Sequence, residues 1–201
     1  DAGVHALGNI AVFDTNARME AEKFSYALNQ GLPEDIRIRA SREVPADFHP
    51  RKTDSVKTYE YHILNEEFPN PVERLYSYFC YVPLDADRMD QAARLLEGEH
   101  DFQSFCSAGA QVESTVRTIY SCTVRREGTK LTIRIRGNGF LYNMVRIIAG
   151  TLMEIGRGKY PPERMRDILE AKDRRTAGPT APAKGLVLVS YDFPVFSEKN
   201  G

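Results

Sequence analysis

The sequence predicts an α+β fold with a mixed, mainly antiparallel sheet flanked by helices. Segments of alternating apolar and polar residues indicate strands, and longer segments with apolar residues at helical spacing indicate helices. The two kinds follow one another in mixed order, whereas a doubly wound fold needs strict alternation. The 201 residues are 42% hydrophobic and 27% charged, which suits a globular protein with a sizeable core.

The first fifty residues predict two strands around one helix. Residues 8–14 form a short apolar run between turn formers, which is typical of a buried strand. Residues 18–30 offer apolar side chains for one helical face and are followed by Gly31 and Pro33, which end helices. Residues 36–40 alternate apolar and basic side chains, as a strand with one solvated face does.

An aromatic-rich region comes next. Residues 55–64 predict a strand with Tyr59, Tyr61 and Ile63 on one face. Residues 75–79 fit either an edge strand or a buried turn.

A helix is predicted over residues 89–96, which place apolar side chains at helical spacing. Asp85 or Asp87 can cap its start, and Gly98 can close it. A β-hairpin is predicted around the turn at residues 127–128. On its second strand, Leu131, Ile133 and Ile135 face one way, and the basic residues Lys130, Arg134 and Arg136 face the other.

The last third predicts two helices and a strand. Residues 140–155 have the apolar content of a long buried helix that ends at Gly156. A second helix begins at the prolines 161–162, a loop covers residues 174–184, and a final strand covers residues 186–193.

Composition excludes several classes of protein. The net charge of −1 and the pI of about 6.5 give no general support for a nucleic-acid partner, so any basic surface must be local. Cys80, Cys106 and Cys122 are scattered without C-x-x-C spacing, which argues against a zinc site or a disulfide framework and fits a reducing cytoplasm. The four histidines lack metal-ligand spacing, and no apolar run is long enough to cross a membrane. We therefore expect a cytoplasmic protein without a metal.

The chain opens with Asp1 in the tightly turned segment Asp-Ala-Gly-Val-His-Ala, without an initiator methionine. We expect it to be the later part of a longer protein. An isolated aspartate beside a glycine more often caps backbone amides than performs chemistry. A catalytic role for Asp1 therefore needs support from other segments.

Six segments together resemble the A-type tRNA pseudouridine synthase family, in the family's order and over almost the whole chain. The opening segment is similar to the second half of the family's motif around its catalytic aspartate. The other matching segments are F-H-P-R at residues 48–51, K-T-Y-E-Y at 57–61, H-D-F-Q-S-F at 100–105, F-L-Y-N-M-V-R at 140–146 and A-K-G-L at 183–186. The family carries several dozen further residues before the aspartate, including Gly-Arg-Thr, and these do not appear here.

This resemblance implies the pseudouridine synthase fold, built from two ferredoxin-like halves of which the first is truncated. Residues 1–52 would be the remnant of the N-terminal half, and residues 53–201 the C-terminal half with most of the active-site pocket. The implied activity is the isomerisation of uridine to pseudouridine in the anticodon stem-loop of tRNA by an aspartate nucleophile. The resemblance also implies a homodimer that needs no cofactor.

Two residues are expected to carry the catalysis. The resemblance assigns the nucleophile to Asp1. A carboxylate in a site that excludes water needs a cation to stay ionised. Arg146 is the candidate, because an arginine on an otherwise apolar helix is costly unless it is paired. The alternative is that its stem packs while its guanidinium reaches solvent.

Two further residues are expected to contact the substrate. A uridine that leaves its stack is best held by an aromatic face with a hydroxyl, and the resemblance selects Tyr59 for this role and leaves Tyr61 as packing. Leu186 is expected to line the pocket floor. RNA contacts are expected from local basic clusters, although such runs are usually solvated faces. The residues assigned to RNA binding are Arg51, Arg117, Arg126, Arg134 and Arg136.

Two alternatives remain open. In the first, the chain is a catalytically inactive fragment that only binds RNA or dimerises, which a turnover assay on unmodified tRNA tests. A nucleoside hydrolase that uses the same carboxylate chemistry would release free uracil, whereas isomerisation leaves the RNA mass unchanged.

Overall fold

The computed structural model describes residues 2–109 and 112–194. The chain divides into two compact units, one formed by the residues up to Asn9 together with those from Asp54 onward, and the other by residues 10–53. The first unit contains a sheet and three of the helices, so the predicted α+β class is confirmed.

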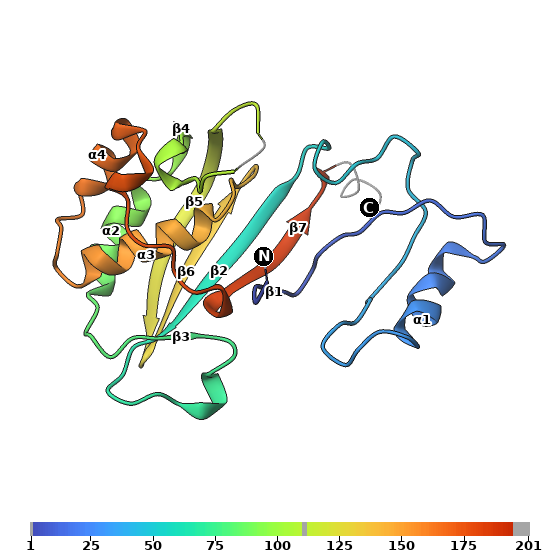
Figure 1. The fold of residues 1–201 in the computed structure, drawn as a ribbon, viewed down its shortest axis with the longest axis horizontal. Coiled ribbons are helices and arrows are strands. Elements are labelled where there is room, and N and C mark those ends of the chain that lie inside the picture. Colours follow the sequence, from blue (N-terminus) through green and yellow to red (C-terminus); the bar gives the residue numbers. More distant parts are fainter. Residues whose placement is uncertain (1, 110–111, 195–201) are drawn as a thin grey trace. The chain divides into compact units, whose positions relative to one another are not determined.

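One mixed sheet of seven strands organises the first unit (Figure 1). Its order is β1-β7-β2-β6-β5-β4, with β3 beside β2. Four of the strand pairs are antiparallel, whereas β1 with β7 and β2 with β3 are parallel, as a mixed and mainly antiparallel sheet requires. The strands are β1 (His5–Ala6), β2 (Val56–Leu64), β3 (Tyr78–Phe79), β4 (Gly98–Asp101), β5 (Val116–Glu127), β6 (Lys130–Gly137) and β7 (Leu186–Asp192).

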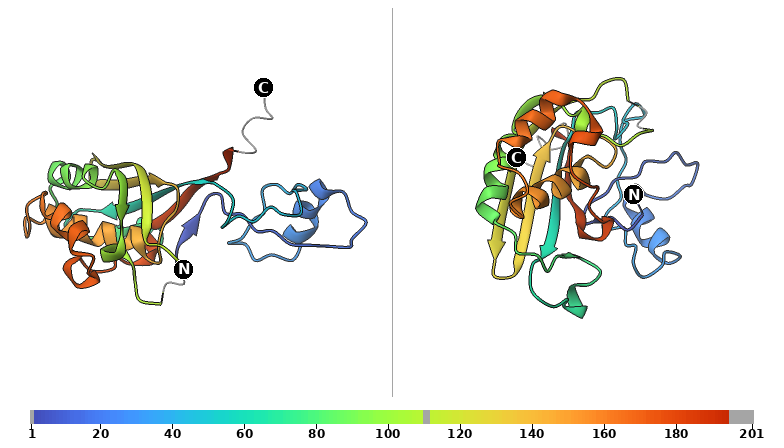
Figure 2. Two further views of the ribbon diagram at one scale, coloured as in Figure 1. Left: turned by 90° about the horizontal axis from the view of Figure 1, so that it is seen from above. Right: turned by 60° about the vertical axis from the view of Figure 1, so that its left-hand side comes forward.

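Helices α2, α3 and α4 cover one face of this sheet (Figures 1 and 2). The four α-helices of the described chain are α1 (Phe24–Asn29), α2 (Ala86–Arg94), α3 (Met144–Gly156) and α4 (Arg164–Ala171). Short 3-10 turns lie at Ala21–Lys23, Pro71–Glu73, Gln103–Phe105, Arg174–Thr176 and Ala183–Gly185. Among the described residues, no helix has the length and apolar character that crossing a membrane requires.

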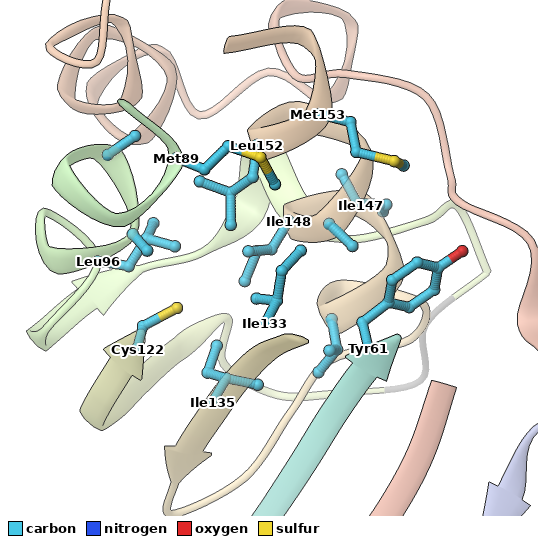
Figure 3. Packing of buried hydrophobic residues seen from close by; sticks show 14 of the residues in the cluster. Tyr61, Met89, Leu96, Cys122, Ile133, Ile135, Ile147, Ile148, Leu152 and Met153 are labelled. Carbon is cyan, nitrogen blue, oxygen red and sulfur yellow. The ribbon is translucent and has the colours of Figure 1, made fainter. Parts of the chain in front are cut away.

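The core lies between the sheet and α3 (Figure 3). Leu131, Ile133 and Ile135 of β6 are at most 1% exposed, which confirms the predicted inner face of the hairpin. Ile147 and Ile148 of α3 are fully buried above them. The alternate residues of β6 point to the face that the helices leave uncovered.

The start of α2 follows the predicted capping chemistry. The Asp85 carboxylate accepts a hydrogen bond from the Arg88 backbone N–H at 3.0 Å, so the first of the two candidate caps is the one used. Gly98 does not close this helix. It opens β4 instead, with a φ of +106° that glycine adopts without strain.

The long helix predicted from residue 140 begins at Met144. Asn143 has a left-handed backbone with φ +61°, which an α-helix cannot include. The end at Gly156 is as predicted. In α4, the apolar residues Met165, Ile168 and Leu169 are buried.

Two strand predictions in the first fifty residues are wrong. Residues 8–14 and 36–40 are not in strands, and in the part of the chain that the structure describes neither segment pairs with a strand of the sheet. The backbone of Ile38 is satisfied by a side chain instead: Asn29 Nδ2 donates to its carbonyl and its N–H donates to Asn29 Oδ1, both at 2.8 Å. The helix predicted over residues 18–30 is shortened to α1 and the 3-10 turn before it.

The ambiguous segment at residues 75–79 contains a short edge strand. Tyr78 and Phe79 form β3 and pair parallel with Ile63 and Leu64 at the end of β2. Of the two interpretations, the edge strand is confirmed for these two residues.

Candidate active site

Strand β2 presents two tyrosines toward α3. Tyr59 and Tyr61 are two residues apart on a strand, so their side chains share a face. Tyr59 is half-buried, and its ring meets the edge of the Phe140 ring at 5.2 Å between centroids and 85° between planes. Burial raises the pKa of Tyr59, with a smaller effect from the nearby Tyr191. The Tyr59 hydroxyl is therefore protonated at neutral pH and can donate a hydrogen bond.

Tyr61 is fully buried and ties the sheet to a loop. Its hydroxyl donates to the carbonyl of Pro182 at 2.9 Å. A Cβ at Gly185 would lie 2.8 Å from the Tyr61 ring, so only glycine allows this approach of the loop. Figure 3 shows Tyr61 at the edge of the core cluster, with its hydroxyl pointing away from the sheet.

Arg146 lies in the first turn of α3 and is half-buried. Its Nε donates to the carbonyl of Ala181 at 2.7 Å, and its Nη1 donates to Asn143 Oδ1 at 2.9 Å. Burial raises the pKa of Tyr61, whereas the positive charge of Arg146 lowers it. The guanidinium is thus held by protein groups near the buried tyrosine, rather than only reaching solvent.

Leu186 opens β7 directly opposite Tyr61 in the antiparallel ladder, and Leu188 lies opposite Tyr59. Both leucines are 6% exposed. Because paired residues of neighbouring strands share a face, Leu186 and Tyr61 point to the same side of the sheet. The structure therefore brings Tyr59, Arg146 and Leu186 to one region of the first unit.

Asp1 lies outside the described residues, but the residues that follow it are described. Gly3 has φ +81°, and a Cβ there would lie 3.4 Å from Ala183 Cβ. Val4 packs against the core, and His5 pairs with Val187 in the ladder of β1 with β7. The chain after Asp1 thus runs beside the turn that follows Ala181, the residue whose carbonyl accepts from Arg146 Nε.

The loop between α4 and β7 is docked closely on α3. The Ala181 N–H donates to the carbonyl of Arg146 at 3.1 Å, and the Gly178 N–H donates to Thr151 Oγ1 at 2.9 Å. A Cβ at Gly150 would lie 1.8 Å from the Pro179 carbonyl oxygen. The small size of Gly150 allows this close contact between the loop and α3. The contact therefore sets the positions of the loop carbonyls that bind Arg146 and Tyr61.

Within the larger unit, the four arginines expected to bind RNA do not form one patch. Arg134 and Arg136 lie on the face opposite the helices, where Arg134 pairs with Glu60, and Arg136 lies 5.3 Å from the Tyr120 ring centroid. Opposite charge and aromatic contact already hold both side chains in place.

Arg117 and Arg126 lie in other parts of the larger unit. Arg117 lies against Gly139, beside Phe140, and its guanidinium donates to the carbonyls of Ser114 and Val116 at 2.9 and 2.6 Å. Burial lowers the pKa of Arg117. Arg51 is exposed and belongs to the unit of residues 10–53. Of the four arginines in the larger unit, Arg117 lies near the Tyr59 region.

Arg126 serves a different part of the fold. Its Nη2 donates to Asn65 Oδ1 at 2.9 Å and to the carbonyl of Leu84 at 2.7 Å. It lines an open surface depression that contains none of Tyr59, Arg146 and Leu186. The lining residues are Asn65, Glu66, Glu67, Tyr81, Pro83, Leu84 and Arg126. This depression is therefore separate from the candidate site.

Sequence reasoning missed the contact of Asn143 with Arg146 and the docking of residues 178–182 on α3. An asparagine before an apolar helical run is an N-cap signal, but its side chain makes no capping bond here. Its contact with Arg146 depends on a left-handed backbone, which the sequence pattern does not indicate. Over the described chain, no three histidine, cysteine, aspartate or glutamate side chains form a group that could hold a metal ion.

Comparison with known proteins identifies close relatives. A family model described as tRNA pseudouridine synthase matches residues 92–194. The tRNA pseudouridine synthase A of Brevibacillus brevis is 50% identical over 188 residues, which cover 94% of this chain and 77% of that protein. The protein of the same name from Halalkalibacterium halodurans is 49% identical over 93% of this chain and 71% of its own length. That from Syntrophomonas wolfei is 42% identical over 96% of this chain and 78% of its own length.

Proposed function

The chain belongs to the tRNA pseudouridine synthase family, and from this premise we propose that Asp1 is the nucleophile in the isomerisation of uridine within the anticodon stem-loop of tRNA. Membership makes the protein an isomerase that converts uridine to pseudouridine in tRNA. The nucleophile, the stem-loop and the residue roles below are our proposal. The observation that carries it is the inward-held guanidinium of Arg146, placed beside the turn along which the chain after Asp1 runs.

The reaction breaks the bond between uracil N1 and ribose C1′, turns the base, and forms a bond from C5 to C1′. N1 gains a proton and C5 loses one, so the RNA mass does not change. The first half is similar to retaining glycoside hydrolysis, in which a carboxylate engages the sugar while positive charge develops on it. The Asp1 carboxylate would act on C1′ or on a proton of the adjacent ribose carbon.

Arg146 would keep the Asp1 carboxylate ionised. A cation at hydrogen-bonding distance favours the charged form of a carboxylate and offsets its desolvation. The apolar residues around Arg146 on α3, Val145 and Ile147, lower the local polarity, which strengthens such an interaction. The bonds to Ala181 and Asn143 support this role, because they hold the guanidinium in place before substrate binds.

Tyr59 would contact the extruded uracil. Its half-buried ring offers an aromatic surface, its contact with Phe140 fixes the ring plane, and its hydroxyl is protonated at neutral pH. Leu186 would form the apolar floor of the pocket. These contacts require the uridine to leave the helical stack.

The tRNA would be held through its phosphates. We assign this role to the five arginines named above; within the larger unit, Arg117 lies near the Tyr59 region. We also propose a cytoplasmic homodimer, in which the tRNA contacts both subunits. Residues 1–52 would be the remnant of the N-terminal ferredoxin-like half and residues 53–201 the C-terminal half. The division between residues 53 and 54 supports this boundary, although β1 joins the sheet of the larger unit.

Product analysis tests the proposal. The 201-residue chain is incubated with an unmodified tRNA transcript, and the RNA is examined by mass spectrometry and by carbodiimide mapping of pseudouridine. We expect an unchanged RNA mass and pseudouridine within the anticodon stem-loop. Free uracil would show hydrolysis instead. Binding of tRNA without any conversion would contradict the proposed catalysis by this chain, and pseudouridine confined to another arm would contradict the proposed stem-loop.

A further inference from the structure

Asn143, the residue that directly precedes α3, has a left-handed backbone conformation. Its dihedral angles are φ +61° and ψ +8°. Among the described residues other than glycine, only Asn143 and Lys172 have a positive φ. The left-handed conformation costs most residues about 1 kcal/mol, and asparagine is among the few that adopt it routinely. A residue held in this conformation calls for an explanation in its surroundings.

The side chain of Asn143 does not perform the usual task of a residue in this position. An asparagine before a helix normally accepts a hydrogen bond from an N–H of the first turn, and Asn143 makes no such bond. Its Oδ1 accepts from Arg146 Nη1 at 2.9 Å, and its Nδ2 donates to Ser107 Oγ at 3.0 Å. The amide therefore joins Arg146 to a second segment of the chain.

Ser107 is itself fixed to the start of the helix. Its N–H donates to the carbonyl of Tyr142, the residue before Asn143, at 3.1 Å. The segment that follows the Gln103–Phe105 turn therefore supports the Asn143 amide through both a backbone and a side-chain bond. Asn143 lies outside the helix, three residues before Arg146, and its left-handed backbone brings its amide to the guanidinium.

Two contacts on different nitrogens fix the orientation of the Arg146 guanidinium. A guanidinium is planar and carries five N–H donors. The C–N bonds of the guanidinium share double-bond character, so the group turns as one rigid plane about the bonds of the side-chain stem. Nε donates to the Ala181 carbonyl and Nη1 donates to Asn143 Oδ1, so the plane cannot tilt or swing without breaking a bond. The bond to Ala181 alone would leave the plane able to pivot about Nε. Asn143 therefore contributes to where the other donors of Arg146 point.

We propose that Asn143 is a positioning residue for the isomerisation, which orients the Arg146 guanidinium toward the nucleophile. This inference rests on the proposed role of Arg146. A positioning role differs from a role in folding. The positioning role depends on the side-chain amide of Asn143, whereas a folding role would depend on its left-handed backbone.

The substitution Asn143→Gly separates the two roles. Glycine adopts a positive φ without strain, so the backbone turn is preserved while the amide is removed. We expect kcat to fall between about tenfold and about 100-fold, as displacement of a catalytic group by about 1 Å can cause. The Kd for tRNA and the melting temperature should stay close to those of the unsubstituted protein. An unchanged kcat in this variant would overturn the proposal. A lower kcat would also overturn it if the fraction of folded protein fell by the same factor.

Ser107 provides a matched pair of variants. Ser107→Ala removes the acceptor for Asn143 Nδ2 and should lower kcat less than Asn143→Gly, by about threefold to tenfold. Ser107→Thr keeps the hydroxyl and should restore most of the activity. Equal activities of the two Ser107 variants would contradict the chain of contacts from Ser107 through Asn143 to Arg146.

Arg146→Met distinguishes failure of this inference from failure of the proposed function. If that variant is active, Arg146 is not needed and the proposed function loses its cation. If it is inactive while Asn143→Gly is fully active, only the positioning role of Asn143 is wrong. A measurement independent of turnover is the Nε–H resonance of Arg146 in ¹⁵N spectra, assigned by its disappearance in Arg146→Met. We expect faster hydrogen exchange of this proton in Asn143→Gly than in the unsubstituted protein, and an unchanged rate would overturn the proposal.

Discussion

At the scale of single residues, Arg146 shows how a charged side chain is accommodated on an apolar helix. Burying a guanidinium without partners is costly, and the bonds to Ala181 and Asn143 reduce this cost. The same bonds hold the charge in one place, which a catalytic cation needs. The resemblance indicated Arg146, Tyr59 and Leu186 as site residues, and the structure places them in one region, while their roles stay predictions. The contact of Asn143 with Arg146 was not predictable from the sequence, because it depends on a backbone conformation set by tertiary contacts.

Arg146→Met tests the proposed cation directly. We expect isomerisation to fall by at least about 100-fold, since a carboxylate without its cation is less ionised in a low-polarity site. Stability should fall by only about 1–2 kcal/mol, because the hydrogen bonds to Ala181 and Asn143 are lost while the packing of the side-chain stem is kept. Single-turnover assays and thermal denaturation measure the two effects. An active Arg146→Met variant would show that the ion pair is not needed.

At the scale of elements, close backbone packing positions the loop between α4 and β7. This loop supplies the Ala181 and Pro182 carbonyls that bind Arg146 and Tyr61. Its approach to α3 depends on Gly150 and Gly178, where an added Cβ would lie within 3 Å of backbone atoms across the contact. The sequence indicated a loop here, but prolines and small residues do not reveal which helix a loop will contact.

Gly150→Ala should displace this loop. The added Cβ would lie 1.8 Å from the Pro179 carbonyl oxygen, so the loop must move away from α3. We expect a loss of about 1–3 kcal/mol in the free energy of unfolding, as is typical of overpacked positions. Isomerisation should fall as well, because Ala181 moves with the loop. Gly31→Ala is the control, since no atom lies within 4 Å of a Cβ there, and a similar loss in both variants would contradict this account.

The end of β4 depends on an ionised carboxylate. Asp101 Oδ1 accepts from Thr115 Oγ1 at 2.6 Å and from the Gln103 N–H at 3.1 Å, and Asp101 pairs with Lys172 Nζ at 3.0 Å. The hydrogen bond from Thr115 is the main cause that lowers the pKa of Asp101 below its usual value of 3.8, and Lys172 and Gln103 add to it against the effect of burial. These contacts connect β4 to β5 and to the end of α4.

Asp101→Asn should therefore alter stability in a pH-dependent way. A carboxyl whose pKa is lowered by folding stabilises the protein fully above its unfolded value of 3.8. That contribution is lost as the pH falls below this value and through the folded pKa. We expect the variant to be less stable by about 1–2 kcal/mol at neutral pH and to approach the parent protein in acid. Chemical denaturation at several pH values measures this, and a pH-independent difference would contradict it.

At the scale of the whole molecule, the sequence predicted the larger unit better than the smaller one. In β2, β6 and α3, the periodic patterns match the burial that tertiary packing imposes, so element type and inner face follow from the sequence. Residues 36–40 have an equally good strand pattern but no partner strand, and Asn29 satisfies the backbone of Ile38 instead. A strand is stabilised by its neighbours, so its pattern alone does not secure it.

The most direct measurement is single-turnover isomerisation of a tRNA transcript by Asp1→Asn, together with the Kd of the variant for the same RNA. The account predicts that isomerisation is abolished while the Kd stays within about threefold, because an amide cannot replace the nucleophilic carboxylate but disturbs few phosphate contacts. Retained isomerisation, or an equal loss of turnover and binding, would remove Asp1 from the chemistry.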